Sequence, residues 1–174
     1  MKAILMSIKH RHNENIHNGT KKNELRTKPP KIECPFKVYN FDTVSSGGCG
    51  KVVSEWICDS METYRICMGI PKHLLDTGCV TSNEVMKYTD NGNKDLTAMH
   101  ISNLVVYDEP KELSEFKKPL SVMEKMVDDD GWWLCDGCPN ARWKNGHLIK
   151  CSDSCCDHRI ITRPPQSWCY VEEH

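Results

Sequence analysis

Four cysteines near the C-terminal end of the chain have the spacing of a tetrahedral metal site. Cys135 and Cys138 form a C-x-x-C pair, and Cys151 opens a second cysteine group after twelve intervening residues. Between the two groups stands Asn145-Gly146, the strongest short signal for a β-hairpin, and a hairpin would bring Cys138 and Cys151 to the same end. Thiolates at this spacing favour Zn²⁺, whose binding energy becomes folding energy. The sequence therefore predicts a zinc site.

Three residues compete for the fourth position of that site: Cys155, Cys156 and His158. Adjacent side chains do not easily bind one ion together, so Cys155 and Cys156 are alternatives, and we take Cys156. Four protein ligands leave no open position for water, which indicates a structural rather than a catalytic zinc. The competing interpretation is a loop whose cysteines are free or joined in disulfides.

A second group of chemically capable side chains occurs in the run Gly19-x-Lys21-x-x-Glu24-x-Arg26. Side chains two apart in a strand point to the same face, so Glu24 and Arg26 are expected to lie close enough to pair. Lys21, two residues beyond a tight turn, adds a second positive charge. Such a trio could hold a phosphate or a base edge, or polarise a carbonyl group. The alternative is an ordinary charged strand face in contact with water.

The charge is unevenly distributed along a chain whose formal net charge is only −1. Residues 1–40 carry nine Lys or Arg and three Asp or Glu, whereas residues 41–130 carry nine and sixteen. The basic segment could face a polyanion, or the two regions could pair within the fold.

The length and apolar content favour one soluble domain with a small insertion. The chain has 174 residues, and no segment approaches the roughly 20 apolar residues that a membrane helix needs. The short apolar run at residues 1–8 is followed by charged residues and not by a cleavage site, so we expect no signal peptide. A cytoplasmic protein without a membrane partner is the expectation, and there a cysteine cluster more often binds metal than forms disulfides.

The elements that would position these residues are short strands joined by loops and short helices. Side-chain alternation and turn residues predict a hairpin with a glycine-rich turn over residues 36–59. Residues 117–163 break the pattern. Strands of this length, with helices confined to the connections, indicate an α+β mixed β-barrel. We expect strands at 2–8, 21–26, 36–43, 51–59, 99–106 and 168–172, helices at 9–18, 72–75 and 82–88, and a short helix or turn at 109–116.

Several segments together resemble the ASCH domain family. The opening Ile4–Lys9 and the motif Gly19–Arg26 are similar to its opening strand, helix and second strand. Lys51–Trp56 resembles its central strand, and His100–Ser102 and Pro164–Trp168 resemble its later barrel segments. The similarity covers about residues 1–116 and 162–173, in the manner of phage and bacterial members. It implies a PUA-like barrel made of residues 1–116 and 162–174, with residues 117–161 inserted as a cysteine-rich, zinc-binding subdomain.

The resemblance also implies a cleft for RNA or a nucleotide-like ligand, lined by Lys21, Glu24 and Arg26. Some small bacterial members are amidohydrolases acting on acetylated cytidine through the motif lysine, a threonine nucleophile and a distant glutamate. This sequence has Glu24 in place of that threonine, and a carboxylate does not simply replace a hydroxyl nucleophile. Lys21 and Glu24 are the candidate catalytic residues.

Three functional hypotheses follow. The first is an RNA- or nucleotide-binding module, the second is a nucleoside- or RNA-processing hydrolase of amidohydrolase or ribonuclease type, and the third is a small phage or mobile-element factor that binds a protein partner. The six remaining cysteines lack metal-ligand spacing: Cys34, Cys49, Cys58, Cys67, Cys79 and Cys169.

Overall fold

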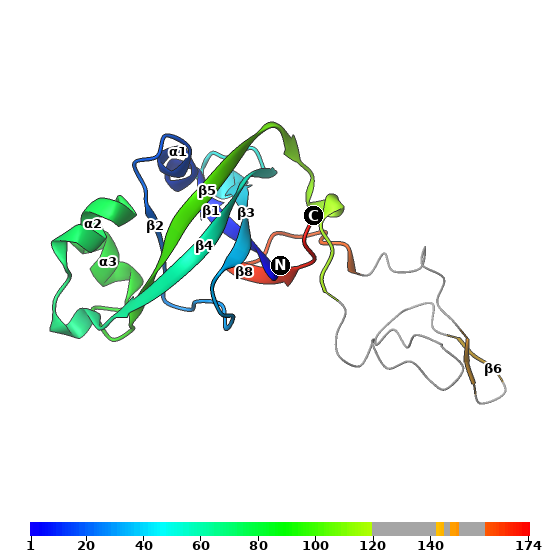
Figure 1. Cartoon of the computed structure of the whole chain (residues 1–174). Coiled ribbons are helices and arrows are strands. Elements are labelled where there is room, and N and C mark those ends of the chain that lie inside the picture. The colour runs from blue at the N-terminus through cyan, green and yellow to red at the C-terminus, as the bar shows by residue number, and fades with distance from the viewer. Residues whose placement is uncertain (120–141, 145–146, 150–158) are drawn as a thin grey trace.

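The computed structural model describes residues 1–119, 142–144, 147–149 and 159–174. A six-stranded mixed sheet curves into a half-barrel, in the strand order β2-β5-β4-β3-β1-β8 (Figure 1). Its only parallel pair in these ranges is β1 with β3, and the other neighbours are antiparallel. The strands are β1 (Ala3–Lys9), β2 (Asn23–Arg26), β3 (Phe36–Thr43), β4 (Val52–Tyr64), β5 (Leu96–Lys111) and β8 (Trp168–Val171).

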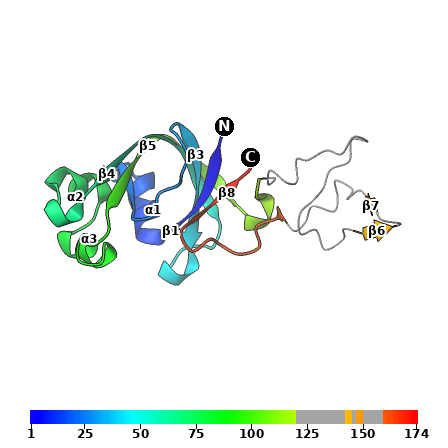
Figure 2. The same cartoon turned by 90° about the horizontal axis from the view of Figure 1, so that it is seen from below.

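Short helices occupy the connections, as an α+β PUA-like fold requires. Seen from below, α2 and α3 lie together at one end of the sheet, beyond α1 (Figure 2). In the described part of the chain no helix is long and apolar enough to cross a membrane. The helices are α1 (His10–His17), α2 (Lys72–Gly78) and α3 (Ser82–Tyr88), with 3-10 turns η1 (Val44–Ser46), η2 (Ile66–Met68) and η3 (Leu113–Glu115).

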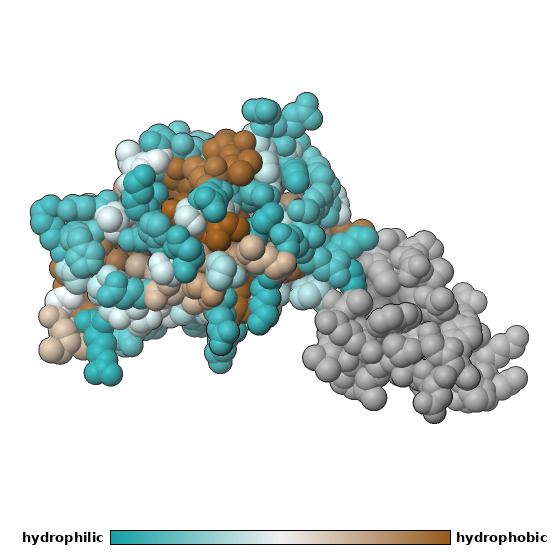
Figure 3. Space-filling model, in the orientation of Figure 1, coloured by the Kyte–Doolittle hydropathy of each residue, from teal (hydrophilic) through white to brown (hydrophobic). Residues whose placement is uncertain are grey.

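Strand β1, between β3 and the edge strand β8, is buried on both faces, which explains its nearly continuous apolar sequence. Ile4 and Met6 point into one core cluster, which also contains Trp56 of β4. Leu5 points into the cluster on the opposite face, which Phe116 helps to close. Polar residues cover most of the face seen in Figure 3, and apolar residues gather in a band over its middle.

A third core cluster fixes α2 and α3 against the sheet. Leu74 of α2 and Val85 of α3 pack with Leu25 of β2 and Leu96 of β5. The Thr81 hydroxyl caps α3, satisfying a backbone N–H that the first turn leaves free. These two helices therefore cover Leu25 of β2.

Local signals predicted some boundaries accurately and others poorly. The bounds of β3 and α3 are confirmed. β4 and β5 are much longer than expected, because their ends continue to pair: Glu62 lies opposite Ala98 and Tyr64 opposite Leu96. Pro110 lies within β5, so the short helix or turn expected at 109–116 is confined to the 3-10 turn η3.

The hairpin predicted around Asn145-Gly146 is confirmed. Strand β6 (Arg142–Lys144) pairs antiparallel with β7 (His147–Ile149), with Arg142 opposite Ile149. The four predicted zinc ligands lie outside the described residues, so the zinc site stays a prediction. On the barrel side, Lys117 forms an antiparallel bridge with Ile160, so these two residues, on either side of the predicted insertion, are neighbours. The division into 1–116 with 162–174 and 117–161 also stays a prediction.

Candidate functional site

The Gly19–Arg26 motif forms the turn after α1 and the edge strand β2. Gly19 has a φ of +74°, which glycine adopts without the cost of a Cβ, and its N–H donates to Ile16 O. The Lys21 N–H donates to Asn15 O, which completes the reversal. Pairing of β2 with β5 then places Glu24 opposite Met99.

Lys21, Glu24 and Arg26 form one compact charged cluster, called here the motif cluster. Arg26 Nη2 lies 2.9 Å from Glu24 Oε1, and Lys21 Nζ lies 3.4 Å from Glu24 Oε2. The predicted pairing of Glu24 with Arg26 is therefore confirmed. The three residues are only 2%, 5% and 8% exposed, so they are not a solvated strand face.

Backbone groups from distant parts of the chain complete the cluster. Lys21 Nζ donates to Gly78 O, at the end of α2, at 2.6 Å. Arg26 Nη2 donates to Ser7 O at 2.9 Å, and Arg26 Nη1 donates to Ser167 Oγ at 3.2 Å. The cluster thus joins β1, β2, the end of α2 and the segment before β8.

The cluster carries two positive charges and one negative charge. Burial by itself raises the pKa of Glu24, but Arg26 and then Lys21 outweigh it, and the pKa lies below its usual value. Glu24 is therefore ionised at neutral pH, and its partners leave the cluster with an excess positive charge.

His12 lies beside this cluster and was not singled out as a site residue by its sequence position. Burial, and then the positive charge of Lys21, lower its pKa from 6.5 to about 4. Its Nδ1 atom is buried and has no hydrogen-bond partner among the described residues. A periodicity argument could have found it, since His12 is four residues before the buried Ile16 on α1.

A shallow groove of about 410 Å³ lies between α1 and the α2–α3 pair. Arg11 Nη2 spans it to Glu84 Oε1 at 2.7 Å. Cys79 and Val80 in its wall directly follow Gly78, whose carbonyl holds Lys21, so the groove and the motif cluster share one stretch of backbone. The lining residues are Arg11, Asn15, Leu75, Asp76, Cys79, Val80, Thr81 and Glu84.

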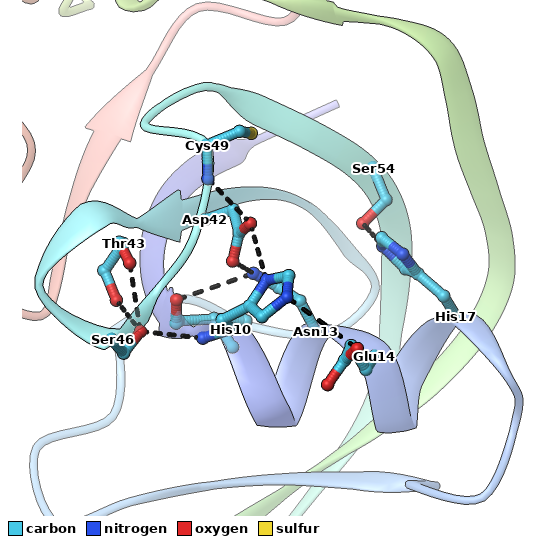
Figure 4. A network of polar contacts seen from close by, with 10 residues as sticks. His10, Asn13, Glu14, His17, Asp42, Thr43, Ser46, Cys49 and Ser54 are labelled. Atoms are coloured by element: carbon cyan, nitrogen blue, oxygen red, sulfur yellow. Dashed lines mark hydrogen bonds and ion pairs between the residues drawn. The ribbon is translucent and has the colours of Figure 1, made fainter.

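A second polar network on another side of α1 is centred on Asp42 (Figure 4). This buried carboxylate accepts from His10 Nδ1 at 2.9 Å, Asn13 Nδ2 at 2.9 Å and the Cys49 N–H at 3.1 Å. A Cβ at Gly48 would come within 2.5 Å of the Asp42 carboxyl carbon, so the loop is fitted closely around it. Asp42 thereby ties α1 to the β3–β4 loop, and we assign it a structural role.

Two histidines of α1 are expected to give opposite pH dependences of stability. The hydrogen bond to Asp42 raises the pKa of His10, so its stabilisation is complete below pH 6.5 and is lost as the pH rises through the folded-state pKa. The pKa of His12 is lowered, so stability is lost as the pH falls from 6.5 towards 4.

Urea unfolding of the wild type, His10→Gln and His12→Gln across this range measures both effects. We expect the free energy of unfolding to depend less on pH between 4 and 6.5 in His12→Gln than in the wild type. In His10→Gln it should depend less on pH above 6.5. Each variant is the control for the other. Identical profiles for the two variants would contradict the assignment.

No family model and no curated protein sequence matches the chain significantly. Solved structures of the ASCH protein from Zymomonas mobilis do match, each at a probability of 1.00. The wild-type structure aligns at a TM-score of 0.55 and 14% identity, covering 64% of this chain and 74% of that one. The chain has the ASCH fold.

Two single-substitution variants of the Zymomonas mobilis protein give the same result. One aligns at a TM-score of 0.54 and 15% identity, over 65% of this chain and 77% of that one. The other aligns at 0.56 and 12% identity, over 99% and 89%. At such identities the likeness establishes the fold, and within the ASCH fold of this chain the motif forms the buried cluster described above.

The described residues contain no cluster of potential metal ligands. No group of three or more His, Cys, Asp or Glu there is arranged to hold an ion. Neither the motif cluster nor the Asp42 network is therefore a candidate metal centre.

Proposed function

We propose that this ASCH-fold protein binds RNA or a nucleotide at the groove between α1 and α2–α3, backed by the motif cluster. The observation that carries the proposal is the buried excess of positive charge: Lys21 and Arg26 share the single carboxylate of Glu24. An anion such as a phosphate, placed near this cluster, would balance its charge in a poorly hydrated setting.

The surface charge of the N-terminal segment supports an anionic ligand. Part of this segment does pair with the acidic middle region, through Arg11 with Glu84 and Lys37 with Glu55. Five lysines remain exposed and have no ion pair within the described part of the chain. They are Lys2, Lys9, Lys22, Lys28 and Lys31.

The groove lies next to the backbone of Gly78, whose carbonyl holds Lys21 of the cluster. In this proposal Arg11 exchanges its ion pair with Glu84 for one with a ligand phosphate. Lys21 exchanges its hydrogen bond to the Gly78 carbonyl for one to the ligand. Arg11 is suited to such an exchange because its side chain is 58% exposed and its ion pair is worth little in water. Asn15, in the same wall, supplies an amide that can pair with a base edge.

RNA binding is tested by fluorescence anisotropy with a labelled single-stranded oligonucleotide at several salt concentrations. We expect the logarithm of the affinity to fall linearly with that of the salt concentration. Arg11→Gln and Lys21→Gln should each weaken binding by about 10-fold, the equivalent of roughly 1.4 kcal/mol.

Lys94→Gln is the matched control, since Lys94 is exposed and its ion-pair partner in the described part of the chain, Asp90, does not line the groove. Circular dichroism establishes that each variant is folded, and Arg11, on the surface, can be replaced without disturbing the core. Wild-type affinity in folded Arg11→Gln and Lys21→Gln would contradict the proposed site.

His12 favours one second candidate, a hydrolase acting on a nucleoside or on RNA. A neutral imidazole with a free buried nitrogen, beside Lys21 and Glu24, can accept a proton from an attacking group. Turnover of acetylated or otherwise modified cytidines, or of RNA, that disappears in His12→Asn would support this candidate. No turnover across such a panel would exclude it.

We also propose a structural zinc bound by Cys135, Cys138, Cys151 and Cys156. The supporting observation is the β6–β7 hairpin, because Arg142 lies opposite Ile149, so the two flanks of the hairpin, which carry the cysteines in the sequence, start from adjacent residues. When bound there, zinc would cross-link these two flanks and stabilise the insertion.

Metal analysis of the purified protein should give one zinc per chain. Cys135→Ser combined with Cys138→Ser should abolish it, whereas Cys67→Ser, at an exposed cysteine of the barrel, should retain it. Zinc retained by the double variant would contradict the ligand assignment. Replacing Cys155, Cys156 and His158 one at a time identifies the fourth ligand.

A further inference from the structure

Two cysteines without metal-ligand spacing lie side by side in the barrel. Cys34 Sγ is 3.9 Å from Cys58 Sγ, although 24 positions separate them in the sequence. Cys34 is half-buried in the loop between β2 and β3, and Cys58 is fully buried in β4.

The backbone geometry allows these sulfur atoms to approach further. Cys58 lies opposite Phe36, so Cys34 sits diagonally across from it, just before β3 begins. A disulfide requires about 2 Å between the sulfurs, which leaves roughly 2 Å to close. Because Cys34 precedes the strand, its side chain can rotate and its loop can adjust without breaking a ladder hydrogen bond of β3.

We propose that Cys34 and Cys58 are a redox-modification site, which forms a reversible disulfide when the protein meets a peroxide. This inference is independent of the proposed function. It concerns a pair in and beside the apolar cluster of Phe36 and Trp56, and neither cysteine lines the groove or belongs to the motif cluster.

Exposure sets the order of the steps. The Cys34 thiolate attacks one oxygen of hydrogen peroxide, so that an S–O bond forms, the O–O bond breaks and hydroxide leaves. The Cys58 sulfur then attacks the Cys34 sulfur, the S–S bond forms, and the S–O oxygen leaves as water once protonated. The two thiols lose two electrons and two protons, and the peroxide is reduced to two waters.

The burial of Cys58 suits it to the second step and not the first. Burial raises the pKa of its thiol, and the neighbouring Cys34 adds to the effect. Its S–H donates to Ser60 O, and burial keeps the thiol protonated until the Cys34 sulfenic acid stands next to it.

The disulfide would fasten the β2–β3 loop to β4. This loop begins directly after Arg26, and its Lys28 carbonyl accepts a hydrogen bond from the Trp168 indole at 2.7 Å. Oxidation would therefore restrain the loop that connects the motif strand β2 to β3 and contacts the edge strand β8 through Trp168. Cross-linking residues 24 apart should raise Tm by roughly 5–10 °C.

Peptide mapping tests the pair directly, because trypsin isolates each cysteine on its own peptide. Ile32–Lys37 contains only Cys34, and Val52–Arg65 contains only Cys58. After treatment of the full chain with hydrogen peroxide, we expect these two peptides cross-linked, two hydrogen atoms lighter than their sum. Dithiothreitol should separate them.

Cys34→Ser should abolish both the cross-linked peptide and the rise in Tm, while Cys67→Ser, at an exposed cysteine, should keep both. Cys34→Ser is the preferred variant because its side chain lies in a loop, whereas replacing the buried Cys58 disturbs the core. The inference is overturned if Cys34 is recovered only as a sulfinic acid, bonded to a different cysteine, or unmodified at peroxide concentrations that oxidise Cys67.

Discussion

Replacing Glu24 by glutamine is expected to lower the free energy of unfolding by about 3–5 kcal/mol, the usual cost of removing one partner of a buried ion pair. The substitution keeps the shape of the side chain but removes the negative charge that Lys21 and Arg26 share. Both cations would then stay buried, with only neutral acceptors such as Gly78 O and Ser7 O. Urea denaturation followed by circular dichroism measures the loss.

Glu33→Gln is the matched control, because Glu33 is exposed and its replacement should change stability by less than about 0.5 kcal/mol. The wild type should also lose stability as the pH falls below 4.5, through the lowered folded-state pKa of Glu24. Glu24→Gln should lack that part of the acid transition. Equal stabilities of Glu24→Gln and Glu33→Gln would show that the motif cluster is not a buried ion pair in solution.

Trp56→Ala is expected to destabilise the fold by about 3–5 kcal/mol, because it opens the largest cavity that a single truncation can make in this core. Trp56 is fully buried between β1 and α1, and its indole N–H donates to Asn40 Oδ1 at 2.8 Å. The truncation also leaves that amide oxygen without its donor, in the interior. Thermal and urea unfolding both report the effect.

Two further tryptophan variants separate packing from hydrogen bonding. Trp168→Ala, at a partly buried residue whose indole donates to Lys28 O, should cost clearly less. Trp56→Phe retains most of the side-chain volume, so its loss of stability should lie between those of Trp56→Ala and Trp168→Ala. If Trp56→Ala costs no more than Trp168→Ala, the core assignment is wrong.

The helix α1 organises both polar networks of the barrel and the wall of the groove. His10 and Asn13 bind the Asp42 carboxylate, and His12 faces the motif cluster. Arg11 and Asn15 line the groove. A helix of eight residues with few apolar side chains is therefore held by tertiary polar contacts, which explains how so polar a segment can cover a sheet.

Local rules predicted the elements whose ends depend on residues close in sequence. The Asn145-Gly146 pair indicates the β6–β7 hairpin, and Thr81 with Glu84 marks the start of α3. The lengths of β4 and β5 were underestimated because residues such as Ser60 and Glu62 carry no strand signal of their own. They are strand residues because a partner strand runs beside them.

The candidate site, too, could be predicted only in part from local rules. The two-residue period of a strand was sufficient to place Glu24 beside Arg26, and the motif together with the C-terminal segment indicated the ASCH resemblance that the fold comparison confirms. Burial of the trio, its link to Gly78, the neutral state of His12 and the approach of Cys34 to Cys58 were decided only by the tertiary structure. A strand's period is local geometry, whereas burial and these contacts depend on segments that meet only when the sheet closes and the helices pack on it.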